Sequence, residues 1–177
     1  MTDGKFRPLW LLQQQGWQIS LAALQTGMAK AQWAGRLQWL EWQGRRLLVD
    51  GAHNPAAAES LRQYVDTLAR PITWVVGILS TKDCEGIFQA LLRASDELLL
   101  VPVPDHSTAE PEALAKLASQ ICPDLAKVQT FPDVFAALDA AEPERQIVLC
   151  GSLYLVGYFL RKYLNLVHLE NLSFLPP

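Results

Sequence analysis

The chain has 177 residues, of which 50% are hydrophobic and 19% charged, with 15 Lys and Arg against 18 Asp and Glu and a formal net charge of -3. This composition excludes a disordered tail, because half of the residues can contribute to a buried core. The length suits one ordinary domain with a short appendage, since domains have roughly 100–200 residues. The sequence contains no run of Lys or Arg, so we predict no nucleic-acid partner and no binding to an anionic membrane surface.

Three cysteines, Cys84, Cys122 and Cys150, lie far apart and form no C-x-x-C pair. An odd, scattered set of this kind is typical of a reducing compartment, and Cys150 is interpreted as a buried, inert thiol. The longest apolar run, residues 147–160, contains two glycines and is shorter than the ~18 residues of a membrane span. No basic segment precedes an apolar stretch near Met1. We therefore expect a cytoplasmic protein without a membrane segment.

The first residues predict two short helices. The stretch 8–15 has helical character and ends at a glycine. Ser20 then precedes Leu21, Leu24 and Met28, whose spacing forms one apolar stripe on a helix with Ser20 as its N-cap. A segment this short cannot form a domain. Its apolar stripe therefore needs a surface to pack on, either in the rest of this chain or in a part absent from it.

From residue 37 onward, short apolar runs alternate with amphipathic stretches of helical length. A β-hairpin is predicted at 37–42 and 45–50, and further strands at 72–77, 97–103, 126–131 and 146–150. Helices are predicted at 55–69, 83–94, 111–121, 133–141 and 154–163. Such alternation indicates parallel crossovers, so we predict a doubly wound α/β domain. Its mostly parallel six-stranded sheet has an antiparallel strand at one edge, and the tail after Asn165 shows no clear period.

The loop after the second strand is the most informative, because ligands of such sheets bind beyond the carboxyl ends of the strands. Asn54 and Pro55 there are typical of a helix start, and Gly51 permits a tight turn. These local rules leave Asp50 and His53 unexplained at the open edge of the sheet. Asp50 can equally cap backbone amides of its own turn, and His53 can be a half-buried loop residue.

Two further loops at this edge carry candidates. Ser152 opens the last predicted helix, so its hydroxyl and the first helical N–H groups form an anion site, or the hydroxyl only caps the helix. Lys82 and Asp83 follow the strand at 72–77 and either face a ligand or start a helix. His106 lies on a Pro-rich polar loop that we expect to be mobile.

Several motifs together resemble one known family. The block DGAHNPAAAESL at 50–61, with Gly35-Arg36 upstream, is similar to the C-terminal domain of the folylpolyglutamate synthase and dihydrofolate synthase group of the Mur ligase superfamily. GILSTKD and CGSLYLVGYFL resemble strand ends of that family. Residues 17–36 resemble the end of its N-terminal ATPase domain with the interdomain linker, although Ala34 replaces the proline that the family usually has. The resemblance covers nearly all of the chain, about residues 9–163.

The resemblance implies a Rossmann-like Mur ligase C-terminal fold in three parts. These are 1–34, the helical end of the ATPase domain plus linker; 35–165, the α/β domain; and 166–177, a tail. It also implies a ligase that activates a folate-linked carboxylate with ATP as an acyl phosphate, which the amine of L-glutamate attacks to form an amide. In that family the C-terminal domain closes over ATP and helps to hold glutamate.

Site residues follow from the same resemblance, which implies neither a catalytic residue nor a metal ligand in this chain. It assigns ATP contacts to Arg36 and Asp50, glutamate contacts to His53 and Ser152, and a further candidate role to Lys82 and Asp83. The phosphate-binding loop G-x-x-x-x-G-K-[ST] is missing, because Gly4-Lys5 is followed by Phe6. We therefore expect Mg²⁺ to be held by a missing N-terminal ATPase domain, and this chain to be a fragment, split gene product or isolated domain that is inactive alone.

Another class of function stays open. The chain can be a stand-alone, non-catalytic α/β ligand-binding module, or the partner subunit of a separate ATPase chain. A doubly wound hydrolase is disfavoured because the sequence has no G-x-S-x-G. The sequence does not distinguish a parent that adds glutamate to dihydropteroate from one that extends folate polyglutamate tails or does both.

Overall fold

A computed structural model describes residues 7–30 and 33–173 and divides the chain into two compact units between Trp33 and Ala34. The first unit contains α1 (Arg7–Gln14) and α2 (Leu21–Lys30), which confirms the two predicted helices. Ser20 caps α2 as predicted, because its Oγ accepts the backbone N–H of Ala23 at 3.1 Å. Met28 of the predicted stripe lies on α2, but its side chain is outside the described part.

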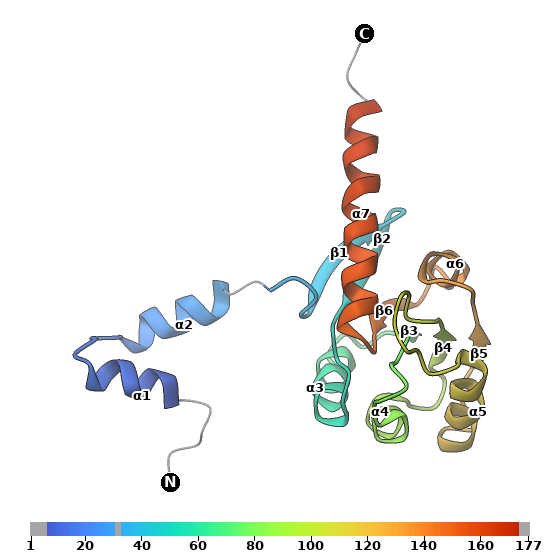
Figure 1. The fold of residues 1–177 in the computed structure, drawn as a ribbon, viewed down its shortest axis with the longest axis horizontal. Coiled ribbons are helices and arrows are strands. Elements are labelled where there is room, and N and C mark those ends of the chain that lie inside the picture. Colours follow the sequence, from blue (N-terminus) through green and yellow to red (C-terminus); the bar gives the residue numbers. More distant parts are fainter. Residues whose placement is uncertain (1–6, 31–32, 174–177) are drawn as a thin grey trace. The chain divides into compact units, whose positions relative to one another are not determined.

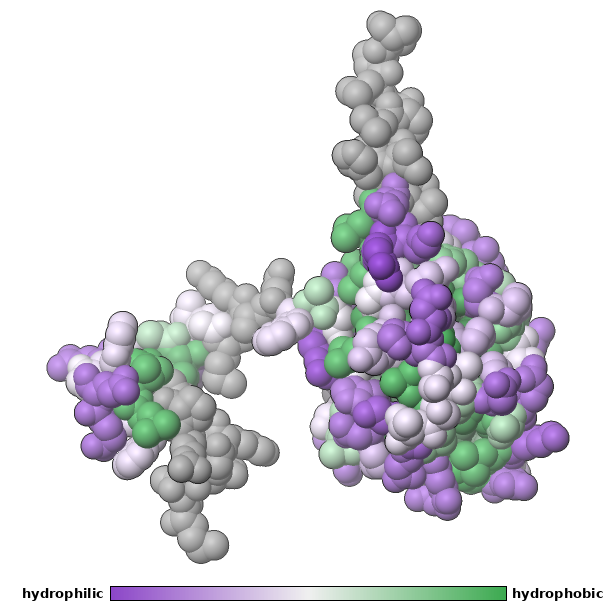
Figure 2. Space-filling model, viewed as in Figure 1, coloured by the Kyte–Doolittle hydropathy of each residue, from purple (hydrophilic) through white to green (hydrophobic). Residues whose placement is uncertain are grey.

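Large apolar side chains are exposed on the first unit. Hydrophobic residues gather on its visible face in Figure 2. Leu21 is 70% exposed and Trp17 63% exposed, and Trp10, Leu11 and Leu12 are exposed as well. These side chains contribute little to a core within this unit.

The second unit is built on one six-stranded sheet. Its strands are β1 (Gln38–Trp42), β2 (Arg45–Val49), β3 (Ile72–Val76), β4 (Glu97–Leu100), β5 (Lys127–Thr130) and β6 (Gln146–Cys150). Their order is β1-β2-β6-β3-β4-β5, with an antiparallel hairpin of β1 and β2 at one edge and parallel pairing elsewhere. The predicted mostly parallel sheet with an antiparallel edge strand is confirmed.

Helices cover both faces of this sheet (Figure 1). One face carries α3 (Pro55–Asp66), α4 (Cys84–Leu91) and α5 (Pro111–Ile121), and the other carries α6 (Val134–Ala140) and α7 (Leu153–Ser173). Side chains of each central strand alternate between the two layers: Trp74 and Val76 pack on the first face and Val75 on the second. The doubly wound arrangement is therefore confirmed, with a core in each of the two layers.

Element ends differ from the predictions in places. The last helix, α7, was predicted to end at Tyr163 but continues to Ser173, because the sequence has no glycine or proline after Gly157 until residue 176. Strand β4 ends at Leu100, before Pro102, which lacks the N–H that a longer ladder needs. No helix in the described ranges is long and apolar enough to cross a bilayer.

Candidate functional site

The turn after β2 is held together by the Asp50 carboxylate. Its Oδ1 accepts the backbone N–H of Ala52 at 2.8 Å, and its Oδ2 accepts that of Leu37, also at 2.8 Å. Asp50 is 7% exposed. The carboxylate thus caps its own turn, which is one of the two interpretations that the sequence left open. It also joins this turn to the segment around Leu37. Each oxygen keeps a second lone pair for a further donor.

The segment around Gly35 is fixed against the same turn. Its carbonyl accepts the N–H of Gly51 at 2.7 Å, and its own N–H donates to Oε1 of Gln38 at 2.8 Å. Gly35 adopts a φ of 72°, and a Cβ there would lie 2.6 Å from Cγ1 of Val156. Only glycine suits that position, because of both its backbone conformation and the close contact with α7.

Arg36 and Asp50 line one cavity of about 250 Å³, although 13 residues separate them in sequence. The other lining residues are Leu37, Ala57, Ser60 and Leu61. Arg36 is exposed, and none of the hydrogen bonds or ion pairs found among the described residues involves its guanidinium. The cavity therefore combines a free fork of cationic donors with a buried carboxylate, a set that suits phosphate and hydroxyl groups of a nucleotide.

His53, three residues beyond Asp50, lines a different cavity. Its Nδ1–H donates to the carbonyl of Gly51 at 2.7 Å, which places the proton of the neutral ring on Nδ1. Nε2 is then the nitrogen left for a ligand. The His53 ring is half-buried, and its hydrogen bond to the backbone fixes its orientation at the cavity.

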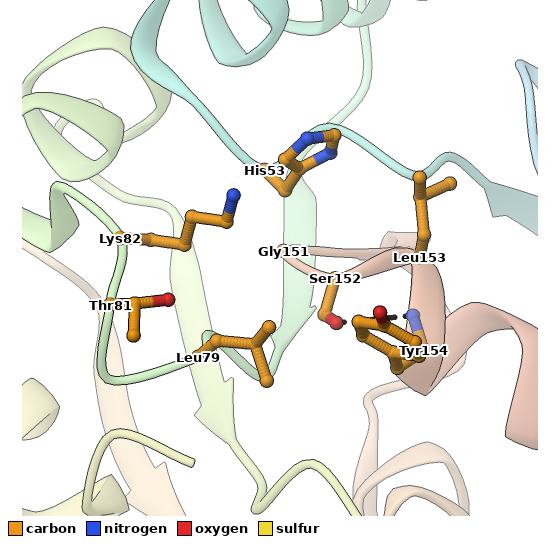
Figure 3. Close-up of a pocket in the computed structure, with 8 residues that line it drawn as sticks. All are labelled: His53, Leu79, Thr81, Lys82, Gly151, Ser152, Leu153 and Tyr154. Carbon is orange, nitrogen blue, oxygen red and sulfur yellow. Dashed lines mark hydrogen bonds between the residues drawn. The ribbon is translucent and has the colours of Figure 1, made fainter. Parts of the chain in front are cut away.

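The cavity that His53 lines has a volume of about 420 Å³ and lies at the carboxyl edge of the sheet (Figure 3). Three segments form it: the turn after β2, the loop after β3 and the turn after β6. Its other lining residues are Leu79, Thr81, Lys82, Gly151, Ser152, Leu153 and Tyr154. Figure 3 shows the Lys82 side chain extending across this space toward His53. None of the lining residues is acidic, so the cavity suits an anionic ligand.

Gly151 permits the backbones at the ends of β3 and β6 to meet. It has a φ of 101°, and a Cβ there would lie 2.6 Å from the carbonyl oxygen of Gly77. Its N–H donates to the carbonyl of Ala52 at 2.9 Å, which joins the turn after β6 to the turn after β2. The conformation of Gly151 therefore sets the distance between segments that line the cavity.

Ser152 is 2% exposed, and its Oγ accepts the backbone N–H of Tyr154 at 3.2 Å. The hydroxyl thus caps the start of α7, as one of the two interpretations of the sequence expected. Ser152 also lines the cavity. A hydroxyl can donate its proton while it accepts this bond, so the cap and a contact with an anion are compatible.

Lys82 and Asp83 separate in the structure. Lys82 is half-buried and lines the cavity. Asp83 is exposed and caps α4, because its Oδ1 accepts the N–H of Gly86 at 2.9 Å. The helix-start interpretation therefore describes Asp83, whereas Lys82 lines the cavity and its contact with a ligand stays a prediction.

Sequence reasoning missed four side chains of this cavity: Leu79, Thr81, Leu153 and Tyr154. The sequence indicated Tyr154 only as the first residue of the helix predicted at 154–163. Its position two residues after Ser152 was the available indication, because residues in the first turn of a helix border whatever the helix start faces. Apolar and hydroxyl side chains such as Leu79 and Thr81 carry no pattern that separates a cavity wall from an ordinary loop.

Two cysteines near the site are held as thiols. Burial, and to a lesser degree the Asp50 carboxylate, raise the pKa of Cys150 far above its usual range. Partial burial and the neighbouring Asp83 charge raise the pKa of Cys84. Neither is an activated nucleophile. Within residues 7–30 and 33–173, no cluster of three or more His, Cys, Asp or Glu could hold a metal ion.

Comparison with known proteins identifies relatives of the chain. The family model described as "Dihydrofolate synthetase, C-terminal domain" matches residues 36–162. The dihydrofolate synthetase of Saccharomyces cerevisiae is 30% identical over 174 residues, covering 86% of this chain and 40% of the yeast protein.

Solved structures show the same relationship. Escherichia coli FolC in complex with DHPP and ADP superposes with a TM-score of 0.68 at 26% identity, over 88% of this chain and 37% of that chain. The bifunctional folylpolyglutamate synthase/dihydrofolate synthase of Yersinia pestis, complexed with AMPPNP and Mn, gives a TM-score of 0.68 at 27% identity with the same coverage. The chain thus spans well under half the length of these relatives.

Proposed function

Because the chain belongs to the family of dihydrofolate synthetase C-terminal domains, we propose that it is the C-terminal part of an ATP-dependent ligase. This ligase adds L-glutamate to dihydropteroate, to folate polyglutamate tails, or to both. One observation carries the proposal: the short turn after β2 contributes Asp50 to one cavity and His53 to another, at the carboxyl edge of a single sheet. Two ligands bound there would be held side by side by one rigid turn.

The smaller cavity is the proposed ATP side. The free guanidinium of Arg36 binds phosphate oxygens, and the remaining lone pairs of Asp50 accept from ribose hydroxyls. Arg36 follows Gly35, whose carbonyl accepts the N–H of Gly51 in the turn that carries Asp50, so the two residues are held close together. Relatives crystallised with ADP and with AMPPNP support this part of the proposal, since the bound nucleotides are named for those proteins.

The larger cavity is the proposed glutamate side. L-Glutamate has two carboxylates, and the cavity offers the Lys82 ammonium, the Ser152 hydroxyl and the N-terminal end of α7 as groups that favour negative charge. His53 offers Nε2 to the substrate amine. Asp83 is left out of this set, because its carboxylate is used as the cap of α4.

The chemistry of the proposed ligase is divided between the two parts of the protein. ATP phosphorylates the folate-linked carboxylate, and the amine of glutamate then attacks the acyl phosphate, releasing phosphate and forming the amide. This chain orients glutamate and closes over the nucleotide. The phosphate-binding loop and the Mg²⁺ ligands belong to the N-terminal ATPase part, so we propose that residues 1–177 alone have no ligase turnover.

A titration of the purified chain with L-glutamate, followed by NMR, tests the proposal. We expect saturable shifts at the backbone of residues 79–82 and 151–154, and about tenfold weaker binding in Lys82→Met, since a hydrogen bond to a charged group contributes about 1.5–3 kcal/mol. The matched control is Lys116→Met, an exposed lysine on α5 far from the cavity in sequence. Absence of saturable shifts, or equal weakening in both variants, would contradict the proposed glutamate site.

A further inference from the structure

The β4–α5 loop, residues 101–110, is hydrogen-bonded to the loop that carries Lys82. Ser80 donates its backbone N–H to the carbonyl of Ser107 at 2.9 Å, and Ala109 donates to the carbonyl of Ile78 at 2.8 Å. Leu79 and Thr108 also form an isolated antiparallel bridge. These contacts argue against the mobile loop that the sequence predicted. Instead, the loop has a defined position beside one wall of the larger cavity.

The same loop reaches the opposite wall through one ring. His106 lies against Tyr154 of α7, with ring centroids 3.8 Å apart and an interplanar angle of 35°. Asp105, directly before it, has a φ of 60°, a conformation that Asp tolerates better than most residues. His106 therefore joins the loop beside Leu79 to the first turn of α7.

Tyr154 has few other restraints. It is 55% exposed, and among the described residues no hydrogen bond involves its hydroxyl and no other ring stacks on it. Its backbone N–H is bound to Ser152, which fixes the Cα but leaves the side-chain torsions free. Among the described residues, the ring of His106 is therefore the only aromatic ring in contact with the Tyr154 ring.

We propose that His106 is a positioning residue that holds the Tyr154 ring as a fixed wall of the larger cavity and thereby sets its affinity for the amino-acid substrate. The second half of this inference rests on the proposed function, and the first half does not. A fixed wall lowers the conformational entropy that is lost when a ligand orders the site. An aromatic contact of this kind favours one orientation modestly, so the effect on affinity is about threefold to tenfold.

NMR on the 177-residue chain tests the first half without any ligand. The chain has four tyrosines, so a Tyr154→Phe variant assigns the Tyr154 ring resonances. We expect His106→Ala to shift them, because the ring current of His106 is lost. His106→Phe should restore the shifts, and Ser107→Ala, an exposed neighbour whose side chain has no hydrogen bond in the described part, should leave them unchanged. Tyr154 resonances in His106→Ala identical to wild type would overturn the inference.

Titration with L-glutamate tests the second half. The dissociation constant should rise about threefold to tenfold in His106→Ala and stay at the wild-type value in His106→Phe and Ser107→Ala. Unchanged affinity in His106→Ala, with Tyr154 shifted, would overturn the link to binding. If wild type bound no L-glutamate while Tyr154 still depended on His106, the proposed function would fail and the positioning of Tyr154 by His106 would stand.

Discussion

Replacing Asp50 with alanine separates its structural role from its proposed contact with ATP. In the native turn the carboxylate accepts the backbone N–H groups of Leu37 and Ala52, each at 2.8 Å, and Asp50 is 7% exposed. Asp50→Ala leaves both donors without an acceptor where water has little access. Asp50→Asn keeps one carbonyl oxygen and can retain one of the two bonds.

The magnitude follows from the two lost bonds. An unsatisfied buried donor costs about 1–3 kcal/mol, and the Ala52 donor is buried while the Leu37 donor is partly buried. We therefore expect Asp50→Ala to lower the free energy of unfolding by about 2–4 kcal/mol and Asp50→Asn by about half of that. Domains are stable by about 5–15 kcal/mol, so both variants should still fold.

Urea denaturation of the purified chain measures these changes, with amide hydrogen exchange at Leu37 and Ala52 as a local readout. The matched control is Glu59→Ala, an exposed carboxylate on α3 that should change stability by less than about 0.5 kcal/mol. A loss below about 0.5 kcal/mol in Asp50→Ala would refute the structural role assigned to the carboxylate. Any effect of this substitution on ATP use in a complete ligase can be interpreted only after that loss is known.

Three other predictions concern the rest of the chain. Asp96→Ala should lower the free energy of unfolding by about 2–4 kcal/mol in urea denaturation, because the buried Arg62 guanidinium loses one of its two carboxylate partners and the Trp74 indole N–H loses its acceptor; a loss no larger than that of an exposed carboxylate would contradict this. Cys150, whose pKa is raised by burial, should stay protonated and fail to react with a thiol reagent at pH 8 until the chain is unfolded, whereas the partly buried Cys84 reacts earlier in a mass-resolved time course. Amides of residues 10–27 should exchange far faster than those of the central strands, since short helices with exposed apolar side chains are marginal in water; equal protection in hydrogen exchange would show that this segment packs on its own chain.

Much of the fold was predictable because its causes are local. The buried strands, such as residues 72–76 and 146–150, are short apolar runs in the sequence. Every residue of these two strands is buried, because parallel strands between two helical layers are covered on both faces. Helix starts were equally readable, since Asn54 and Ser20 each accept a backbone N–H of the helix that follows. Apolar runs and helix caps both depend on residues within a few positions of one another, so the sequence alone indicates them.

The length of the last helix shows where local patterns ended. The sequence after Asn165 shows no clear apolar period, so it predicts no helix there. The structure continues α7 to Ser173 (Figure 1). Helix continuation needs only the absence of a breaker and favourable backbone propensity, whereas an apolar period reports packing against a core. The two criteria differ where a helix extends beyond its sheet.

The composition of the candidate site was decided by tertiary structure. Asp50 and His53 are three residues apart but line different cavities, whereas Lys82 and Ser152 are 70 positions apart and line the same one. Strand order is the reason: β6 lies between β2 and β3, so the loops after these three strands converge at one edge. The sequence alone identified the polar residues that follow each strand, because strand ends are local features. Their partners depended on which strands pair across long stretches of chain, and the contact of His106 with Tyr154 depended on the same long-range pairing.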